Sequence, residues 1–479
     1  MKSNGFSLKD WIVLGIVLVV TVFLWAVPAG FYGIEGLTPV MQRTIAIFVF
    51  TALMWIVEVI PTWTTSVVSM VIMLLTVSNK GLSFMMYDGA GTYVDYRSIM
   101  AAFADPVIML FMGGFVLAIA ASKVGLDITL ARFLLKPFGR NPKMVLLGFL
   151  FIIGTFSMFM SNTATAAMML TFLAPVLASL PKDEKGKIGL ALAIPIAANL
   201  GGMGTPIGTP PNAIALGALQ NAGIEVTFVG WMVRMVPYVV LMLLFAWVLL
   251  LILFPFKTKS VELKIEGSSS APKRHKIIVS ITFALTIILW VGEALFKVNA
   301  NIVALIPFAV FTATGVFSRD DLRDIDWSVL WMVAGGFALG TALDNTGLAE
   351  ALINAVPFAS WNVLAVMVSG GLICWILSNF ISNSAAANLI VPILAVVGKA
   401  LMENPAASGP FMAIGGLKSL VIGVAMCASL AMTLPISTPP NALAHSTGII
   451  STKEMAVVGL AVGVVGIVLA YLMLVLVGF

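Results

Sequence analysis

The sequence predicts an all-α polytopic membrane protein with about eleven transmembrane helices and two re-entrant hairpins, arranged as inverted repeats. Composition is the first reason: 60% of the 479 residues are hydrophobic and 10% are charged, and the mean hydropathy is +1.08. Such a chain lacks the polar residues that would cover a water-facing surface. We therefore expect an integral membrane protein that has the lipid bilayer as its solvent.

An internal repeat is the second reason. Three motifs occur in the same order in both halves: a Gly-Gly pair, a polar triplet centred on asparagine, and a Pro-Pro pair followed by asparagine. The second glycine of the Gly-Gly pair precedes the asparagine of the triplet by 48 residues in the first half and by 47 in the second. Polar triplets and helix-breaking motifs that recur inside an apolar chain are typical of transporters built from two structural repeats. The motifs are Phe111-Met112-Gly113-Gly114-Phe115, Ser161-Asn162-Thr163 and Gly208-Thr209-Pro210-Pro211-Asn212, then Val333-Ala334-Gly335-Gly336-Phe337, Ser382-Asn383-Ser384 and Ser437-Thr438-Pro439-Pro440-Asn441.

Apolar segments of roughly 20 residues, the length that crosses a bilayer, divide the chain into expected spans. Two further apolar stretches, residues 144–180 and 361–398, are too long for one crossing and contain the two polar triplets, so we expect re-entrant hairpins there. The expected spans are residues 11–33, 41–60, 63–78, 104–122, 188–219, 229–256, 277–296, 301–317, 327–343, 412–447 and 455–478.

Charge asymmetry predicts the orientation in the membrane. The first span is too long for a secretory signal and lacks a small-residue cleavage site, so it is expected to remain in the mature protein. With a cytoplasmic N-terminus, cytoplasmic segments hold 19 of the 26 Lys and Arg residues and the other side holds the remaining seven. The positive-inside rule then places the C-terminus at Phe479 outside. This asymmetry also explains the net charge of +5, and no nucleic-acid partner is implied.

The halves are joined by a polar segment, residues 257–275, whose Gly267-Ser268-Ser269-Ser270 run is typical of a flexible linker. After each Gly-Gly-Phe motif the chain becomes amphipathic, over Ala121–Phe138 and Leu343–Phe358. These segments are expected either to lie in the membrane interface as arms or to be ordinary loop helices. Five crossings separate span 104–122 from span 327–343, so the two repeats should face opposite directions.

The polar triplets are the first candidate binding residues. Each lies where an apolar segment must reverse direction, and unwound backbone at membrane depth persists only where protein or a polar cavity satisfies it. Their hydroxyl and amide groups donate to a carboxylate or accept around a cation. Ser157 and Ser378 stand five positions before Asn162 and Asn383, and their hydroxyls are candidates to complete cation shells.

The two Thr-Pro-Pro-Asn motifs predict broken helices, because proline lacks the amide proton and obstructs the preceding turn. The half-helix that starts at each proline pair directs its positive end at the break, which favours anions, while freed carbonyls suit sodium. A single membrane Ser or Asn more often joins helices by hydrogen bonds. The two-fold pattern of clusters favours a binding role instead. Close helix packing explains the Gly113-Gly114 and Gly335-Gly336 pairs fully.

Ionisable and metal-binding residues are scarce near these motifs. Glu58 and Asp105 stand at the ends of their spans and are expected to be interfacial, with a coupling role for either as the minor alternative. The two histidines are far apart in sequence, and Cys374 and Cys427 lie in apolar segments without metal spacing. An intramembrane enzyme would need a constellation that is not evident here. A dianion would then be held by helix ends and bound sodium.

At these residues the chain resembles the divalent anion/sodium symporter family, specifically its di- and tricarboxylate carriers, over nearly its whole length. The resemblance implies an elevator-type homodimer that carries C4 dicarboxylates, sometimes citrate, with two or more sodium ions and without an organic cofactor. It implies substrate contacts from Ser161, Asn162, Thr163, Thr209, Ser382, Asn383, Ser384 and Thr438. It also implies one sodium shell from Ser157, Ser161, Asn162 and Gly208, and a second from Ser378, Asn383 and Ser437.

Two positions depart from symmetry or from the family pattern. Ser384 stands where the family often has Thr, which removes a methyl group from the pocket wall, and Asn388 matches Ala167 in the first half. Asn388 is interpreted mainly as a residue that joins helices. The chain without long termini suits a bacterial inner membrane.

The expected function is sodium-coupled symport of succinate, malate or fumarate by alternating access. The alternatives are a sodium-independent dicarboxylate exchanger, a citrate or sulfate carrier of the same fold, and a channel. The expected organisation is scaffold helices 1–103, transport elements 104–228 with a broken helix at 204–212, a linking span 229–256, the linker 257–275, scaffold helices 276–326, transport elements 327–453 with a broken helix at 434–441, and a final span 454–479.

Overall fold

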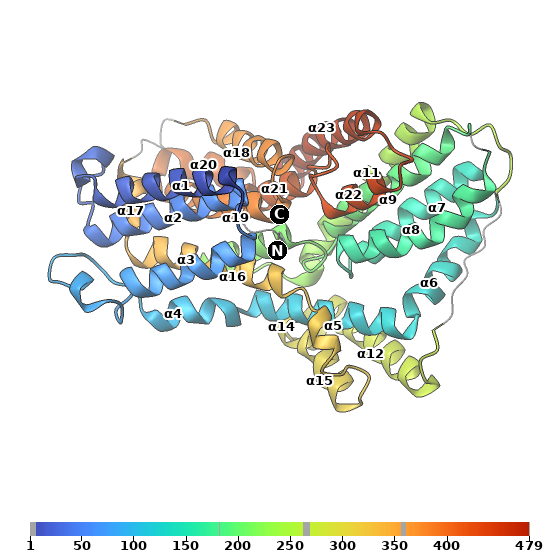
Figure 1. Cartoon of the computed structure of the whole chain (residues 1–479), viewed down its shortest axis with the longest axis horizontal. Coiled ribbons are helices and arrows are strands. Elements are labelled where there is room, and N and C mark those ends of the chain that lie inside the picture. Colours follow the sequence, from blue (N-terminus) through green and yellow to red (C-terminus); the bar gives the residue numbers. More distant parts are fainter. Residues whose placement is uncertain (1–5, 182, 262–268, 356–360, 479) are drawn as a thin grey trace.

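The computed structural model describes residues 6–181, 183–261, 269–355 and 361–478, and its regular structure is helical (Figure 1). Within these residues the β-structure is limited to one isolated bridge between Ser78 and Val94. Eight of the described helices are long and apolar enough to cross a membrane, or nine if the bent pair Pro405–Ala413 and Gly416–Ser429 counts as one span. The all-α polytopic prediction is confirmed, while the count of eleven spans stays a prediction.

Within the described residues, the first half contains eleven α-helices. Their order follows the predicted spans, with the predicted hairpin formed by two helices and the predicted broken helix by two more. They are α1 (Leu8–Ala26), α2 (Pro39–Val57), α3 (Thr62–Thr76), α4 (Tyr96–Ala101), α5 (Pro106–Val124), α6 (Leu126–Leu135), α7 (Pro142–Ser157), α8 (Asn162–Ser179), α9 (Gly186–Gly202), α10 (Pro210–Asn221) and α11 (Phe228–Leu253).

The second half repeats this order from the Gly-Gly helix onward, so that α16 corresponds to α5, and α20 is an additional helix. The hairpin α7–α8 corresponds to α18–α19, and the broken helix α9–α10 corresponds to α21–α22. The helices are α12 (Lys273–Val291), α13 (Glu293–Phe296), α14 (Ala300–Val303), α15 (Leu305–Ala313), α16 (Trp327–Asn345), α17 (Leu348–Ala355), α18 (Val363–Ser378), α19 (Asn383–Glu403), α20 (Pro405–Ala413), α21 (Gly416–Ser429), α22 (Pro439–Ser446) and α23 (Thr452–Leu476).

Reciprocal packing joins the two halves. Helix α10 packs against α19 and α21 of the other repeat, and α22 packs against α8 and α9. In the same way α3 packs against α16, and α15 packs against α5. Each broken helix therefore completes the hairpin bundle of the other repeat, as two repeats related by a pseudo-two-fold axis require. Figure 1 shows the hairpins α7–α8 and α18–α19 on opposite sides of the centre.

The glycine pairs lie where helices approach closely. A Cβ atom at Gly113 would lie 2.0 Å from the Ala304 carbonyl oxygen, and one at Gly335 would lie 2.4 Å from the Ser66 Cβ atom. These contacts join α5 to the α14–α15 region and α16 to α3, at matching positions of the two repeats. The close packing predicted for both pairs is confirmed.

Replacing these glycines by alanine is expected to destabilise the fold. Gly113→Ala and Gly335→Ala each force backbones or a neighbouring Cβ apart, which costs about 1–3 kcal/mol in a packed core. Thermal unfolding of the purified protein in detergent measures the effect. Gly340→Ala on the same helix α16 is the matched control, because nothing lies within 4 Å of its added Cβ. Equal melting temperatures for Gly335→Ala and Gly340→Ala would contradict the prediction.

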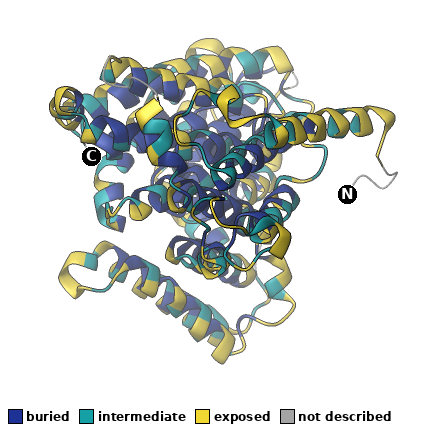
Figure 2. Ribbon diagram, turned by 90° about the vertical axis from the view of Figure 1, so that its left-hand side faces the viewer, coloured by how far each residue is buried: buried dark blue, intermediate teal, exposed yellow. Residues whose placement is uncertain are grey.

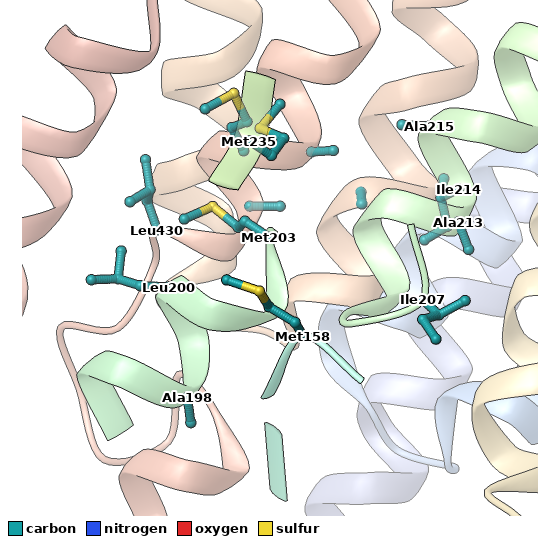
Figure 3. Close-up of a cluster of buried hydrophobic side chains, with 14 of the residues drawn as sticks. Met158, Ala198, Leu200, Met203, Ile207, Ala213, Ile214, Ala215, Met235 and Leu430 are labelled. Carbon is teal, nitrogen blue, oxygen red and sulfur yellow. The ribbon is translucent and has the colours of Figure 1, made fainter. Parts of the chain in front are cut away.

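Apolar side chains pack around the first broken helix. The first break comprises residues 203–209, between the end of α9 and the start of α10. Figure 3 shows Met158 from the hairpin, Met203 from the break and Met235 from α11 clustered there with Leu430, and all four are buried. The indole nitrogen of Trp231 also donates to the Met203 carbonyl oxygen, at 2.9 Å. These contacts support the unwound backbone of the first break.

The predicted amphipathic segments are the helices α6 and α17. Helix α6 packs against α5 and α7, and α17 packs against α16 and α19. Both therefore connect a Gly-Gly helix to a hairpin; Phe358, at the end of the second predicted segment, lies outside the described residues.

The start of the linker is attached to the α8–α9 connection. The carboxylate of Glu184 accepts from the amide and hydroxyl of Thr258, at 2.9 and 2.7 Å, and from the Lys257 amide, at 3.1 Å. Burial of this carboxylate opposes its ionisation, but these hydrogen bonds outweigh the effect and lower its pKa. Residues 262–268 of the predicted linker lie outside the described residues.

Helix α1 lies at the periphery. It packs against α2, and Figure 2 shows it projecting from the body with most of its surface exposed. The exposed side chains are large and apolar, including Trp11, Ile16 and Val19. Such a surface suits lipid and not water.

Candidate functional site

A cavity of about 260 Å³ lies where the two hairpin tips meet the two breaks. The second break comprises residues 430–438, between α21 and α22. Thr62 of α3, Phe111 of α5 and Met332 of α16 contribute to the remaining wall. All eight predicted substrate residues line this one cavity: Ser161, Asn162, Thr163, Thr209, Ser382, Asn383, Ser384 and Thr438.

The N-termini of four helices of the hairpins and broken helices converge on the cavity. The sequence predicted this for α10 and α22, and the structure adds α8 and α19, which begin at the two triplets. Ser161 caps α8 by accepting from the Ala164 amide at 3.2 Å, and Ser382 caps α19 by accepting from the Ala385 amide at 3.2 Å. Because helix N-termini carry partial positive charge and free amide donors, they form an anion-binding environment.

Charged side chains are nearly absent from this wall. The lining among the described residues contains no Lys or Arg and one carboxylate, Asp326. Asp326 is exposed and caps α16 by accepting from the Val329 amide at 3.2 Å. Asp105 holds the equivalent place at the start of α5, where it accepts from the Val107 amide at 2.8 Å. The sequence analysis did not single out Asp326, although its match to Asp105 was a usable signal.

Glu58 is brought to the tip of the second hairpin. It ends α2 in the left-handed region, with φ of 48°, which is uncommon for a residue other than glycine. Its carboxylate lies close to the Ser382 backbone amide. The sequence analysis expected an interfacial residue and gave it a coupling role only as the minor alternative. In this structure it links a scaffold helix to a residue of the second triplet.

In the first repeat the triplet asparagine faces an oxygen cluster. One terminal atom of the Asn162 amide lies 2.7 Å from the Ser157 hydroxyl, 3.1 Å from the Ala198 carbonyl oxygen and 3.2 Å from the Gly208 carbonyl oxygen. In the amide orientation that places nitrogen at this position, the nitrogen donates hydrogen bonds to all three groups. In the opposite orientation an amide oxygen faces the other oxygens, an arrangement that a bound cation stabilises.

The second repeat has a matching cluster. The Ser378 hydroxyl lies 2.8 Å from Asn383 Oδ1 and 3.0 Å from the Ala428 carbonyl oxygen. Ser437, the counterpart of Gly208, donates its hydroxyl to the Asn379 carbonyl oxygen at 2.9 Å. Ser157 and Ser378 lie behind the lining and are fully buried. The structure therefore brings together Ser157, Asn162 and Gly208 in the first repeat, and Ser378 and Asn383 in the second. Ser161 and Ser437 line the same cavity.

The motif asparagines hold the breaks open. Asn212 Nδ2 donates to the carbonyl oxygens of Gly202 and Thr205, at 3.1 and 2.8 Å. Asn441 Nδ2 donates in the same way to Met432 and Leu434, at 2.8 and 2.9 Å. Each amide thus satisfies carbonyls that the helix interruption frees, which explains why an asparagine follows each proline pair.

Asn199 and Asn388 are buried polar residues near the site. Asn199 on α9 lines the cavity and reaches the other repeat, where its Nδ2 donates to Thr438 and Asn441. Asn199 was not predicted from the sequence, because nothing local marks a single asparagine in an apolar helix. Asn388 does not line this cavity, and its Nδ2 donates to the Met332 carbonyl oxygen of α16 at 3.3 Å. That contact agrees with its interpretation as a residue that joins helices.

Comparison with known proteins gives consistent matches. A family model described as citrate transporter matches residues 52–415. The chain is 28% identical to the sodium-dependent dicarboxylate transporter SdcS of Staphylococcus saprophyticus, over 98% of this chain and 91% of that protein. It is 30% identical to an uncharacterized transporter of Haemophilus influenzae, over 95% of each chain.

Among solved structures, the YdaH transporter of Alcanivorax borkumensis, whose topology is described as unusual, matches with a TM-score of 0.55 and 14% identity, over 91% of this chain and 98% of that one. At this identity the likeness concerns the fold alone. Together with the sequence matches, it confirms the resemblance drawn from the paired motifs.

Proposed function

Because the chain belongs to the citrate transporter family and is a membrane transporter, we propose that it is a secondary active carrier of C4 dicarboxylates coupled to sodium. Succinate, malate and fumarate are the proposed substrates. The relatives described as sodium-dependent dicarboxylate transporters support this substrate class and coupling ion.

The observation that carries the proposal is the convergence of four helix N-termini on one cavity whose described lining has no Lys or Arg. A dianion enters such a site only if its charge is compensated, and the available sources are amide dipoles and co-bound cations. The cavity volume of about 260 Å³ accommodates a small dicarboxylate. Each repeat supplies hydroxyl and amide groups to its lining, and two such sets suit a molecule with two carboxylates.

The proposed substrate contacts are those of the two triplets and the two motif threonines. Ser161 and Ser382 are engaged as helix caps through their oxygens, so their hydroxyl protons remain available to a carboxylate. The exposed Thr163 and half-buried Ser384 occupy equivalent places beside them. The full proposed set is Ser161, Asn162, Thr163, Thr209, Ser382, Asn383, Ser384 and Thr438.

Two sodium ions are proposed as co-substrates, one behind each triplet. Neutral hydroxyl, amide and carbonyl oxygens are suitable ligands for a hard monovalent cation. The oxygens around Asn162 include two backbone carbonyls, from Ala198 and Gly208, which have no proton to donate. A cation there would also supply positive charge next to the substrate. The ligand sets are Ser157, Ser161, Asn162 and Gly208, and Ser378, Asn383 and Ser437.

Transport by an elevator movement within a homodimer is proposed together with this function. Hairpins and broken helices form one interlocked bundle through the contacts of α10 with α19 and of α22 with α8, which suits movement as a unit. The proposed location is a bacterial inner membrane, with a cytoplasmic N-terminus and an external C-terminus. The charge asymmetry between the loops supports this orientation.

Uptake by purified protein in proteoliposomes tests the proposed function. Labelled succinate is expected to accumulate when an inward sodium gradient is imposed and to remain near the empty-vesicle level when potassium replaces sodium. Dissipating the gradient with a sodium ionophore should release the accumulated succinate. Excess unlabelled malate and fumarate should compete.

Different outcomes identify the alternatives. Uptake that ignores sodium but requires internal dicarboxylate would indicate an exchanger. Strong competition by citrate or by sulfate, with weak competition by malate, would indicate a carrier for that anion. Flux that does not saturate would indicate a channel.

A further inference from the structure

The Thr438 hydroxyl is fully engaged inside the protein. Its Oγ1 donates to Asn441 Oδ1 at 3.0 Å and accepts from the Asn441 amide at 3.3 Å. It also accepts from Asn199 Nδ2 at 3.2 Å. A hydroxyl has one proton and two lone pairs, so these three contacts use its whole capacity. Although Thr438 lines the cavity, its hydroxyl has nothing left to offer a substrate, so Thr438 is withdrawn as a hydroxyl donor from the proposed substrate contacts.

Thr209 is the equivalent residue of the first repeat and behaves differently. Its backbone angles, φ −151° and ψ 145°, nearly match those of Thr438 at −143° and 150°. Yet its side chain does not cap α10, and its hydroxyl makes no hydrogen bond to any residue that the structure describes. It lines the same cavity, so this hydroxyl is available to a ligand. The backbone conformation does not explain the difference.

A single substitution between the repeats accounts for it. The hairpin serines fix the register, because Ser157 donates to the Ala198 carbonyl and Ser378 donates to the Ala428 carbonyl. The next residue is Asn199 in one repeat and Ser429 in the other. Asn199 reaches the second break. Ser429 is shorter, and its buried hydroxyl has no partner within the described part of the chain, so it does not engage Thr209.

The Asn199 amide is held by one end only. Nδ2 donates to Thr438 and to Asn441 Oδ1, at 3.2 and 3.3 Å, and the side chain is 1% exposed. Its Oδ1 is buried without a partner among the described residues. Buried polar atoms without partners are rare in folded proteins. The orientation of this amide therefore follows from its contacts with the second break.

We propose that Asn199 is a positioning residue that makes the two ends of the substrate site unequal. By engaging Thr438 and Asn441, it keeps the second threonine within the protein and leaves Thr209 as the motif threonine that donates to the substrate. This inference rests on the proposed function. It deepens that function by assigning one of the two carboxylate positions an additional hydroxyl donor, so that a dianion with unequal ends has a preferred orientation.

A double-mutant cycle in proteoliposomes tests the assignment, with the KM and Vmax of labelled succinate measured at saturating sodium. Thr209→Val removes the hydroxyl and is expected to raise KM about tenfold, as expected when one hydrogen bond to a charged group is lost. Thr209→Ser should restore the KM. In the Asn199→Ser background, Thr438 loses its contact with Asn199 and keeps only Asn441 as a partner. Because the equivalent Asn212 does not hold the Thr209 side chain, we expect Thr438 to take the free arrangement that Thr209 shows, and the KM increase caused by Thr209→Val should fall to about threefold or less.

The reciprocal variant, Ser429→Asn, should raise KM about tenfold without any change at Thr209, because its amide would engage that hydroxyl. If it unfolds in detergent, the combined variant Asn199→Ser/Ser429→Asn keeps the number of amides constant and takes its place. If Thr209→Val raises KM by the same factor in the unmodified protein and in Asn199→Ser, the assignment of Asn199 is overturned. A purely structural role of Asn199 would lower only stability and Vmax. Absence of carboxylate uptake by the unmodified protein would instead refute the proposed function.

Discussion

Asn162→Ala and Asn383→Ala are each expected to abolish transport while the protein remains folded. Each asparagine lies at a hairpin tip, lines the cavity and contacts the serine behind it, at 2.7 and 2.8 Å. Removing the amide takes away a substrate contact and a proposed cation ligand together. Two hydrogen bonds to charged partners are worth about 1.5–3 kcal/mol each, so uptake should fall about 100-fold or more. Sodium-driven uptake in proteoliposomes measures this loss.

Asn388→Ala is the matched control for these two variants. Asn388 is a buried membrane asparagine on the same helix as Asn383, but it contacts the Met332 carbonyl and does not line the cavity. Its replacement should lower the melting temperature in detergent and leave the KM for succinate unchanged. The site assignment would be refuted if Asn162→Ala and Asn383→Ala both retained uptake comparable to that of Asn388→Ala.

Much of the site was predictable because its parts carry local signals. A proline pair breaks a helix wherever it occurs inside one, and the predicted interruptions at 204–212 and 434–441 overlap the observed breaks at 203–209 and 430–438. The triplets identified the hairpin tips because they are polar groups inside apolar stretches too long for one crossing. Their helix-capping role was not anticipated. It adds two helix N-termini to the cavity and strengthens the case for an anion.

Contacts between distant segments were not predictable in the same way. Glu58, Asp326 and Asn199 reach the site from three different helices, and each looks ordinary in its own stretch of sequence. Glu58 contacts a residue more than 300 positions away, and Asn199 contacts the other repeat. Their positions follow from the packing of the two repeats, which the repeat pattern implies only in outline. Asp326 alone had a sequence signal, through its correspondence with Asp105.

Gly208→Ala is expected to eliminate sodium-coupled transport through its effect on the first break. A Cβ atom at this position would lie 2.3 Å from the Gly202 carbonyl oxygen. Since that neighbour is backbone, it cannot move without displacing the end of α9. The Gly208 carbonyl would move as well, and it lies 3.2 Å from the Asn162 amide. The expected result is a loss of uptake about 100-fold or more at moderate sodium, partly recovered at high sodium because a distorted cation site binds more weakly.

Gly204→Ala, four residues earlier in the same break, provides the comparison. Its added Cβ would meet the Met158 side chain at 2.8 Å, and an adaptable methionine side chain yields at lower cost than the backbone carbonyl that Gly208→Ala meets. This variant should therefore keep most of its uptake and an almost unchanged sodium dependence. Equal losses in the two variants would mean that the break tolerates no added volume anywhere. An unchanged sodium requirement in Gly208→Ala would remove the Gly208 carbonyl from the proposed ligands, because the backbone contact leaves no way to insert a methyl group without moving that oxygen.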